Sequence, residues 1–105
     1  AGIFAATGQD LGQIGTSSVG ITDYTIKNNI LNIDLTMPSL EVGIIGGGTQ
    51  IPAQKNCINI MNINDSSHFS KVIASTVLCG ELSLMTALCK GNLVSSHIKY
   101  NRGIK

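Results

Sequence analysis

The chain has 105 residues, a formal net charge of +1, a hydrophobic fraction of 43% and a charged fraction of 12%. This length corresponds to one small domain, which excludes separate cofactor and substrate domains within it. The mean hydropathy of +0.26 and the low charge exclude an intrinsically disordered chain. Because Lys and Arg cluster only in the last seven residues, nonspecific binding of nucleic acid has no electrostatic basis.

The cysteine pattern and the hydropathy limit the possible environments of the chain. Cys57, Cys79 and Cys89 form no Cys-x-x-Cys pair and have no His at metal-ligand spacing. We therefore expect three thiols in a reducing compartment, without a disulfide framework or a metal site. No signal pattern is evident, nor any run of about 18 apolar residues that could span a bilayer, so we expect no membrane contact.

The first part of the chain predicts a short helix and a β-hairpin. Residues 1–6 are small and apolar, like a helix entered partway through, which suggests a fragment. The Thr7-Gly8 pair is a suitable place for that helix to end. Residues 19–36 form two alternating, β-branched runs around Asn28-Asn29, and Asn tolerates the positive φ of tight hairpin turns.

The second part predicts a third strand and two helices. The strand is expected near residues 41–45 and the first helix near residues 51–62, where Pro52 suits a first helical turn. The periodicity predicts a long core helix near residues 67–90, with Ser66 or Ser67 as its N-cap. The expected fold class is α+β, with the hairpin and the third strand packed with this helix.

Spacing alone gives only modest signals for a functional site. The turn at residues 46–49 lets backbone N–H groups approach an anion, although a tight turn is the alternative. No Lys follows it, so it is not a Walker loop. His97 could donate a proton near neutral pH, or be an ordinary packed or surface residue. Asp10 could simply cap a helix.

Five blocks, taken in order, carry a resemblance to a known family. The blocks are Thr7 to Asp10, Thr36 to Gly43, Gly46 to Thr49, Gly80 to Leu88 and Leu93 to His97. They resemble the C-terminal portion of the catalytic domain of class I 3-hydroxy-3-methylglutaryl-CoA (HMG-CoA) reductases, the eukaryotic and archaeal type. The resemblance covers nearly the whole chain and implies that residues 1–105 are a segment of a larger catalytic domain.

The resemblance implies the activity, the cofactor and the partners. The family reduces HMG-CoA to mevalonate and free CoA with two molecules of NADPH, in the mevalonate pathway of isoprenoid and sterol synthesis. Its active site is assembled between subunits of a homo-oligomer, either a dimer or a tetramer. Full-length eukaryotic relatives are anchored in the endoplasmic reticulum membrane with the catalytic part on the cytosolic face, so this segment is expected to be soluble.

The resemblance also implies roles for individual residues. Asp10 would hold and tune a catalytic Lys and Glu, and His97 would protonate the departing CoA thiolate. For Leu84, Ala87 and Leu88, a place in the ordinary core is the alternative. The cofactor-binding residues implied are Gly46, Gly47, Gly48, Thr49, Asn101 and Arg102, and the substrate-binding residues are Gln9, Leu84, Ala87 and Leu88.

Parts of the family pattern are missing or altered. The catalytic Glu and Lys and the NADPH subdomain belong upstream of residue 1, so the isolated segment is expected to be inactive. Ile14 and Val19 replace an Asn that is usual at each position. These departures leave open a catalytically dead remnant that docks on an intact reductase as an interaction module. A small α+β domain binding an anion at residues 46–49 is a third alternative.

Overall fold

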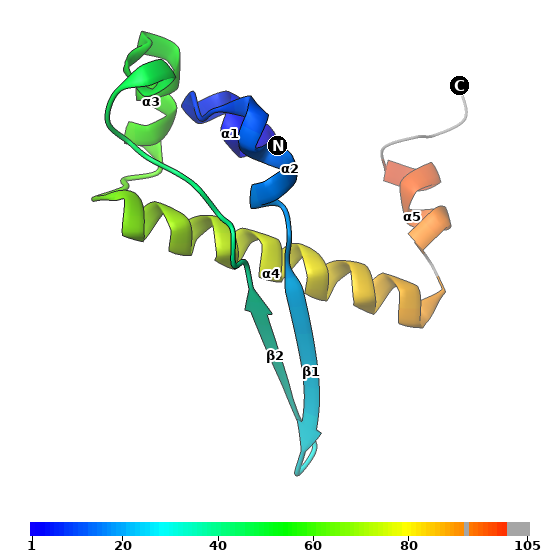
Figure 1. The fold of residues 1–105 in the computed structure, drawn as a ribbon. Helices are drawn as coiled ribbons and strands as arrows, with labels where there is room; N and C mark the ends of the chain where they lie inside the picture. Colours follow the sequence, from blue (N-terminus) through cyan, green and yellow to red (C-terminus); the bar gives the residue numbers. More distant parts are fainter. Residues whose placement is uncertain (92, 101–105) are drawn as a thin grey trace. The chain divides into compact units, whose positions relative to one another are not determined.

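The structure, a computed structural model, describes residues 1–91 and 93–100. The chain divides into two units, Ala1–Ser75 and Thr76–Lys105. Helix α4 begins in the first unit and ends in the second, which also contains α5 (Figure 1). In chain order the elements are α1 (Gly2–Thr7), the 3₁₀ helix η1 (Leu11–Gln13), α2 (Ile14–Ser17), β1 (Ile21–Lys27), β2 (Ile30–Thr36), the 3₁₀ helix η2 (Gly47–Gln50), α3 (Pro52–Ile60), α4 (Ser66–Lys90) and α5 (Leu93–Tyr100).

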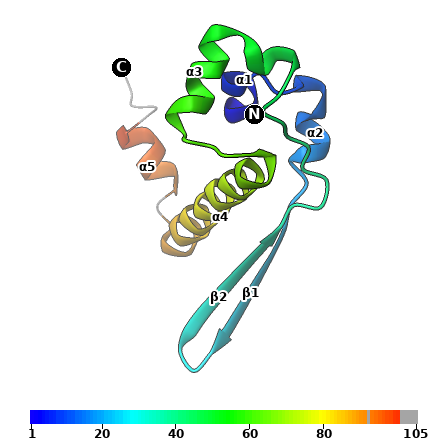
Figure 2. The same cartoon turned by 90° about the vertical axis from the view of Figure 1, so that its left-hand side faces the viewer.

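Strands β1 and β2 form the predicted hairpin (Figure 2). Asn28 and Asn29 at the turn have φ values of 53° and 62°, and positive φ at both central residues is characteristic of the type I′ turn. Residues paired across an antiparallel ladder share a face. One face is therefore largely apolar, with the pairs Thr22–Leu35, Tyr24–Ile33 and Ile26–Leu31.

The turn makes a testable contribution to stability. Replacing Asn28 with Val should lower the free energy of unfolding by about 1–2 kcal/mol, because a β-branched side chain strongly disfavours positive φ. Asn32→Val is the matched control, since Asn32 is an exposed strand position where Val is favoured. Urea unfolding measures both variants. Equal stability of the two variants would contradict the assigned turn.

The prediction of a third strand at residues 41–45 is wrong. Among the described residues, only β1 and β2 form a sheet. Side chains occupy the backbone groups that a neighbouring strand would bond: the Glu41 N–H donates to Ser17 Oγ at 3.1 Å, and the Gly43 N–H donates to Gln9 Oε1 at 2.9 Å. Side-chain bonds of this kind give the backbone an alternative to a ladder.

The short helices follow their local signals. Helix α1 ends where predicted, because Gly8 adopts φ 70° and donates its N–H to the Phe4 carbonyl. Helix α3 begins at Pro52 as predicted and ends at Ile60, two residues before the expected boundary at residue 62. Asn62, with φ 54°, has already left the helical conformation. The buried apolar side chains of this unit are Phe4, Ile58, Phe69 and Ile73.

The predicted long helix is confirmed, with two differences. Its N-cap is Asp65 rather than Ser66 or Ser67, because Asp65 Oδ1 accepts the His68 N–H at 2.7 Å. Its buried residues are confined to the first turns, at Phe69 and Ile73. Within this chain α4 is therefore a core helix only where it begins.

Helix α4 also corrects the expectation about membrane-spanning segments. Among the described residues, it is long and apolar enough to cross a membrane, judged by length and composition alone. An 18-residue stretch of the helix has a mean hydropathy of 1.8, and 6% of that stretch is buried. The sequence pattern missed this segment because scattered Ser and Thr interrupt the apolar run without lowering its average much. The expected absence of membrane contact stays a prediction, because length and composition alone do not place a helix in a bilayer. Helices that are apolar on all sides occur both in membranes and inside large soluble domains.

Helix α5 was not predicted. Its eight residues, Leu93–Tyr100, include the pair Ser95-Ser96, and Ser has only modest helix propensity. A segment of this length is marginal as an isolated helix. Local sequence therefore gave too weak a signal to predict it.

Candidate functional site

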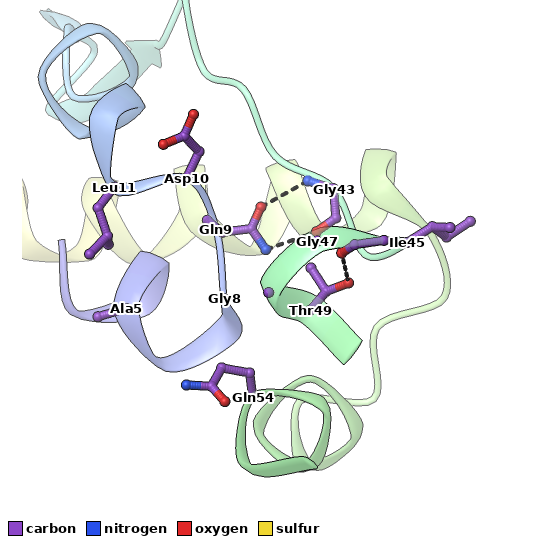
Figure 3. A pocket seen from close by; sticks show the side chains of 12 residues that line it. Ala5, Gly8, Gln9, Asp10, Leu11, Gly43, Ile45, Gly47, Thr49 and Gln54 are labelled. Carbon is purple, nitrogen blue, oxygen red and sulfur yellow. Dashed lines mark hydrogen bonds between the residues drawn. The ribbon is translucent and has the colours of Figure 1, made fainter. Parts of the chain in front are cut away.

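Three segments of the first unit line a depression of about 640 Å³ (Figure 3). They are residues 5–11, from α1 to the start of η1, the turn at residues 43–49, and Gln54 of α3. The depression thus brings Gln9 and Asp10 together with the predicted glycine turn, although more than thirty residues separate them in sequence. Its size falls in the range of small-molecule sites, about 300–1,000 Å³.

Gln9 bridges two of these segments. Its Nε2 donates to the Gly43 carbonyl at 2.8 Å and its Oε1 accepts the Gly43 N–H at 2.9 Å. The same Nε2 donates to the Thr7 carbonyl at 3.3 Å. In Figure 3 the Gln9 side chain points toward Gly43, while the next side chain, Asp10, points away from it. The predicted substrate-binding residue therefore makes its hydrogen bonds within the protein.

Asp10 lies at the rim of the depression with an exposed carboxylate. Its Oδ1 accepts the Gly12 N–H at 2.9 Å, which makes Asp10 the N-cap of η1. The capping alternative considered from the sequence is thus present. The exposed carboxylate also remains accessible to a group approaching from outside this chain.

The glycines of the turn serve two different purposes. Gly46 and Gly47 have φ values of 80° and 54°, and a Cβ at either residue would meet no atom within 4 Å. Gly48 is instead crowded, because its Cβ would lie 2.8 Å from the Gly8 carbonyl oxygen. Gly46 and Gly47 therefore leave bare backbone beside the depression, whereas Gly48 lets the chain pass close to Gly8.

The buried residue Thr49 stabilises the turn by hydrogen bonds. It is 5% exposed, its N–H and its hydroxyl both bond to the Gly46 carbonyl, and its hydroxyl accepts a bond from Gln50 Nε2 at 3.1 Å. The tight-turn alternative is therefore observed. A cofactor at this turn would therefore contact the backbone of the glycines, because the Thr49 hydroxyl is already bonded within the turn.

Gln54 is a lining residue that the sequence did not indicate. The residue borders the depression. Its Oε1 atom is buried and has no hydrogen-bond partner among the described residues. Buried polar atoms usually have a partner. Gln54 belongs to no motif, and only the approach of α3 to the glycine turn places it here.

The other predicted site residues lie outside the first unit. Leu84 and Leu88 are exposed on α4, and Ala87 is partly exposed. His97 lies in α5, where the structure describes its backbone only. Asn101 and Arg102 lie outside the described residues. No group of three or more His, Cys, Asp or Glu that could hold a metal ion occurs within the described ranges.

Comparison with known proteins decides the family. The family model for hydroxymethylglutaryl-coenzyme A reductase matches residues 1–102. The chain belongs to the HMG-CoA reductase family. It is 48% identical over 111 residues to 3-hydroxy-3-methylglutaryl-coenzyme A reductase 1 of Dictyostelium discoideum, an alignment that covers 95% of this chain and 20% of the relative.

Other HMG-CoA reductases match over a similar stretch. Identity is 46% over 114 residues with reductase 1 of Cannabis sativa, covering 98% of this chain and 20% of the relative. It is 44% over 107 residues with the reductase of Schistosoma mansoni, covering 97% of this chain and 11% of the relative. The chain thus spans about a fifth or less of these relatives. The Cannabis alignment is longer than the chain itself, so that relative carries residues within this stretch that the chain lacks.

Proposed function

We propose that this chain is the C-terminal segment of an HMG-CoA reductase catalytic domain, which reduces HMG-CoA to mevalonate and CoA with NADPH. The family match over residues 1–102 supports this proposal. The observation that carries it furthest is that Gln9, Asp10 and the glycine turn, from separate motifs, line one depression. Within such an enzyme the segment supplies part of the active site.

Two residues carry the proposed chemistry. The exposed Asp10 carboxylate would hold a Lys and a Glu of the upstream portion, favouring the charged Lys beside the oxyanion that forms at the substrate carbonyl. His97 would donate a proton to the departing CoA thiolate, since imidazole titrates near neutral pH. Leu84 and Leu88, which are exposed on α4, would contact the substrate.

The residues present fit part of an NADPH site. Gly46 and Gly47 offer backbone without side-chain obstruction beside the depression, and backbone N–H groups can approach a polar ligand closely there. NADPH supplies the hydride when bound. Arg102, with Asn101, would hold the cofactor phosphates through its guanidinium group.

The exposed apolar surface supports a place within a larger assembly. Ile26 is 77% exposed on the apolar face of the hairpin, and most of α4 is apolar and uncovered. Glu81, near the middle of α4, disfavours a bilayer as the cover, because an ionised side chain there is costly. We propose that upstream residues and a second subunit cover these surfaces, and that the catalytic part lies on the cytosolic side of the endoplasmic reticulum membrane.

One assay tests the proposal with two samples. The first is this chain alone, and the second is a chimera in which the chain replaces the matching stretch of the Dictyostelium reductase. We expect NADPH consumption that depends on HMG-CoA from the chimera and none from the chain alone. Turnover by the isolated chain, or none by a folded chimera, would contradict the proposal.

The exposed apolar face of the hairpin also favours a second candidate, an interaction module. A catalytically dead remnant would use such a surface to dock on an intact reductase. Stable association of the chain with the Dictyostelium reductase, together with an inactive chimera, would favour this candidate. An active chimera would exclude a dead remnant.

A further inference from the structure

We propose that Gln9 is a positioning residue, which fixes the glycine turn relative to Asp10, rather than a residue that contacts substrate. The inference rests on the proposed function only where it concerns catalysis. It assigns Gln9 a role different from the substrate contact that the family resemblance implies. Its basis is the hydrogen bonding of the Gln9 carboxamide.

The carboxamide of Gln9 has little capacity left for a ligand. A carboxamide offers two N–H donors and one carbonyl oxygen. Gln9 donates to the carbonyls of Gly43 and Thr7, at 2.8 Å and 3.3 Å, and accepts from the Gly43 N–H at 2.9 Å. Both N–H donors are therefore occupied, so a substrate acceptor could bind the Gln9 amide nitrogen only in place of the Gly43 or Thr7 carbonyl, and a backbone carbonyl that loses its partner is costly.

The pair of bonds to Gly43 takes the place of a strand neighbour. Gln9 satisfies both the N–H and the C=O of Gly43, as an adjacent strand would do in a ladder. A carboxamide can do this because one side chain carries both a donor and an acceptor. A carboxylate lacks the donor, and an alkyl chain lacks both.

Gln9 and its neighbour together hold the glycine turn at two points. Gly8 passes so close to Gly48 that a Cβ on Gly8 would lie 2.3 Å from the Gly48 carbonyl. Gln9 holds Gly43, at the other end of the same segment. Asp10 follows directly, so its position relative to Gly46 and Gly47 depends on both contacts.

The test uses Gln9→Glu and Gln9→Ala in the Dictyostelium chimera, with hydrogen exchange of residues 41–45 and steady-state kinetics as readouts. Both variants should expose residues 41–45 to faster exchange than in the parent chimera at the same pH. They should lower kcat by about 10²-fold, as a displacement of about 1 Å can do, with little change in KM for HMG-CoA.

The pH dependence separates the two variants. A carboxylate at residue 9 places an acceptor opposite the Gly43 carbonyl, whereas a protonated Glu carries one donor and one acceptor, as the bonds to Gly43 require. The defect of Gln9→Glu should be complete at high pH and shrink as the carboxyl becomes protonated at low pH. The defect of Gln9→Ala should not change in this way.

The control is Gln13→Glu, the same chemical change at a side chain that makes no capping hydrogen bond. A raised KM for HMG-CoA with unchanged exchange at residues 41–45 would overturn the inference in favour of substrate contact. If the parent chimera is inactive, the proposed function fails. The exchange measurement then still decides whether Gln9 holds Gly43.

Discussion

Replacing Asp10 with Asn in the Dictyostelium chimera should lower kcat by about 10²- to 10⁴-fold, the range expected for loss of a group that supports proton transfer. The substitution removes the negative charge that we propose holds the upstream Lys. It keeps an oxygen that can accept the Gly12 N–H, so the cap of η1 is retained. Steady-state kinetics with saturating HMG-CoA and NADPH measures the effect.

Asp23→Asn is the matched control for Asp10. It makes the same chemical change at an exposed position of β1, outside the depression, and should leave kcat close to that of the parent chimera. Unfolding of the Asp10 variant should also be unchanged, because its cap survives. A kcat for Asp10→Asn equal to that of Asp23→Asn would remove Asp10 from the catalytic machinery.

Replacing Gly8 with Ala should lower the free energy of unfolding by about 3 kcal/mol or more. The added Cβ would lie 2.3 Å from the Gly48 carbonyl carbon and oxygen, which are backbone atoms, and Gly8 has φ +70°. Overpacking costs about 1–3 kcal/mol, and a left-handed conformation about 1–2 kcal/mol more. Urea unfolding of the chain, followed by circular dichroism, measures the loss.

Gly15→Ala is the control for that substitution. A Cβ at Gly15 meets nothing within 4 Å, and Gly15 lies in α2, where Ala is favoured over Gly by about 0.5–1 kcal/mol. The two variants should therefore change stability in opposite directions. If Gly8→Ala does not fold well enough to be measured, faster proteolysis at residues 8 and 48 in the chimera provides the comparison. Equal effects of the two variants would contradict the close approach of Gly8 and Gly48.

The elements predicted correctly from the sequence carry their signals locally. Asn28-Asn29 determines the hairpin turn by its own backbone preference, and Pro52 marks the start of α3 without help from distant residues. The long apolar period of α4 likewise needs no partner to be recognised. These signals were sufficient for the α+β class and for the boundaries of the hairpin, α3 and α4 to within two residues. They did not indicate η1, α2, η2 or α5.

Two of the failures depend on contacts between distant residues. The strand expected at residues 41–45 does not form because Ser17 and Gln9 bond its backbone, and no local pattern shows that. The same holds for Gly48, which the sequence could not separate from Gly46 and Gly47. Its lack of a side chain is explained by Gly8, forty residues earlier.

The candidate site was predicted in part. The family motifs indicated Asp10 and the glycine turn, and the structure places both at one depression. The motifs could not indicate that the Gln9 amide is occupied by Gly43 and Thr7, or that Gln54 lies alongside. Side-chain hydrogen bonding across the fold is not encoded in the spacing of residues within a motif.

By our proposal, this chain supplies the Asp10 and glycine-turn part of a reductase active site. HMG-CoA-dependent consumption of NADPH by the Dictyostelium chimera tests it most directly, with mevalonate measured as product. We expect turnover of the same order as that of the Dictyostelium parent, lost in Asp10→Asn and retained in Asp23→Asn. A folded chimera that binds NADPH but forms no mevalonate would contradict it.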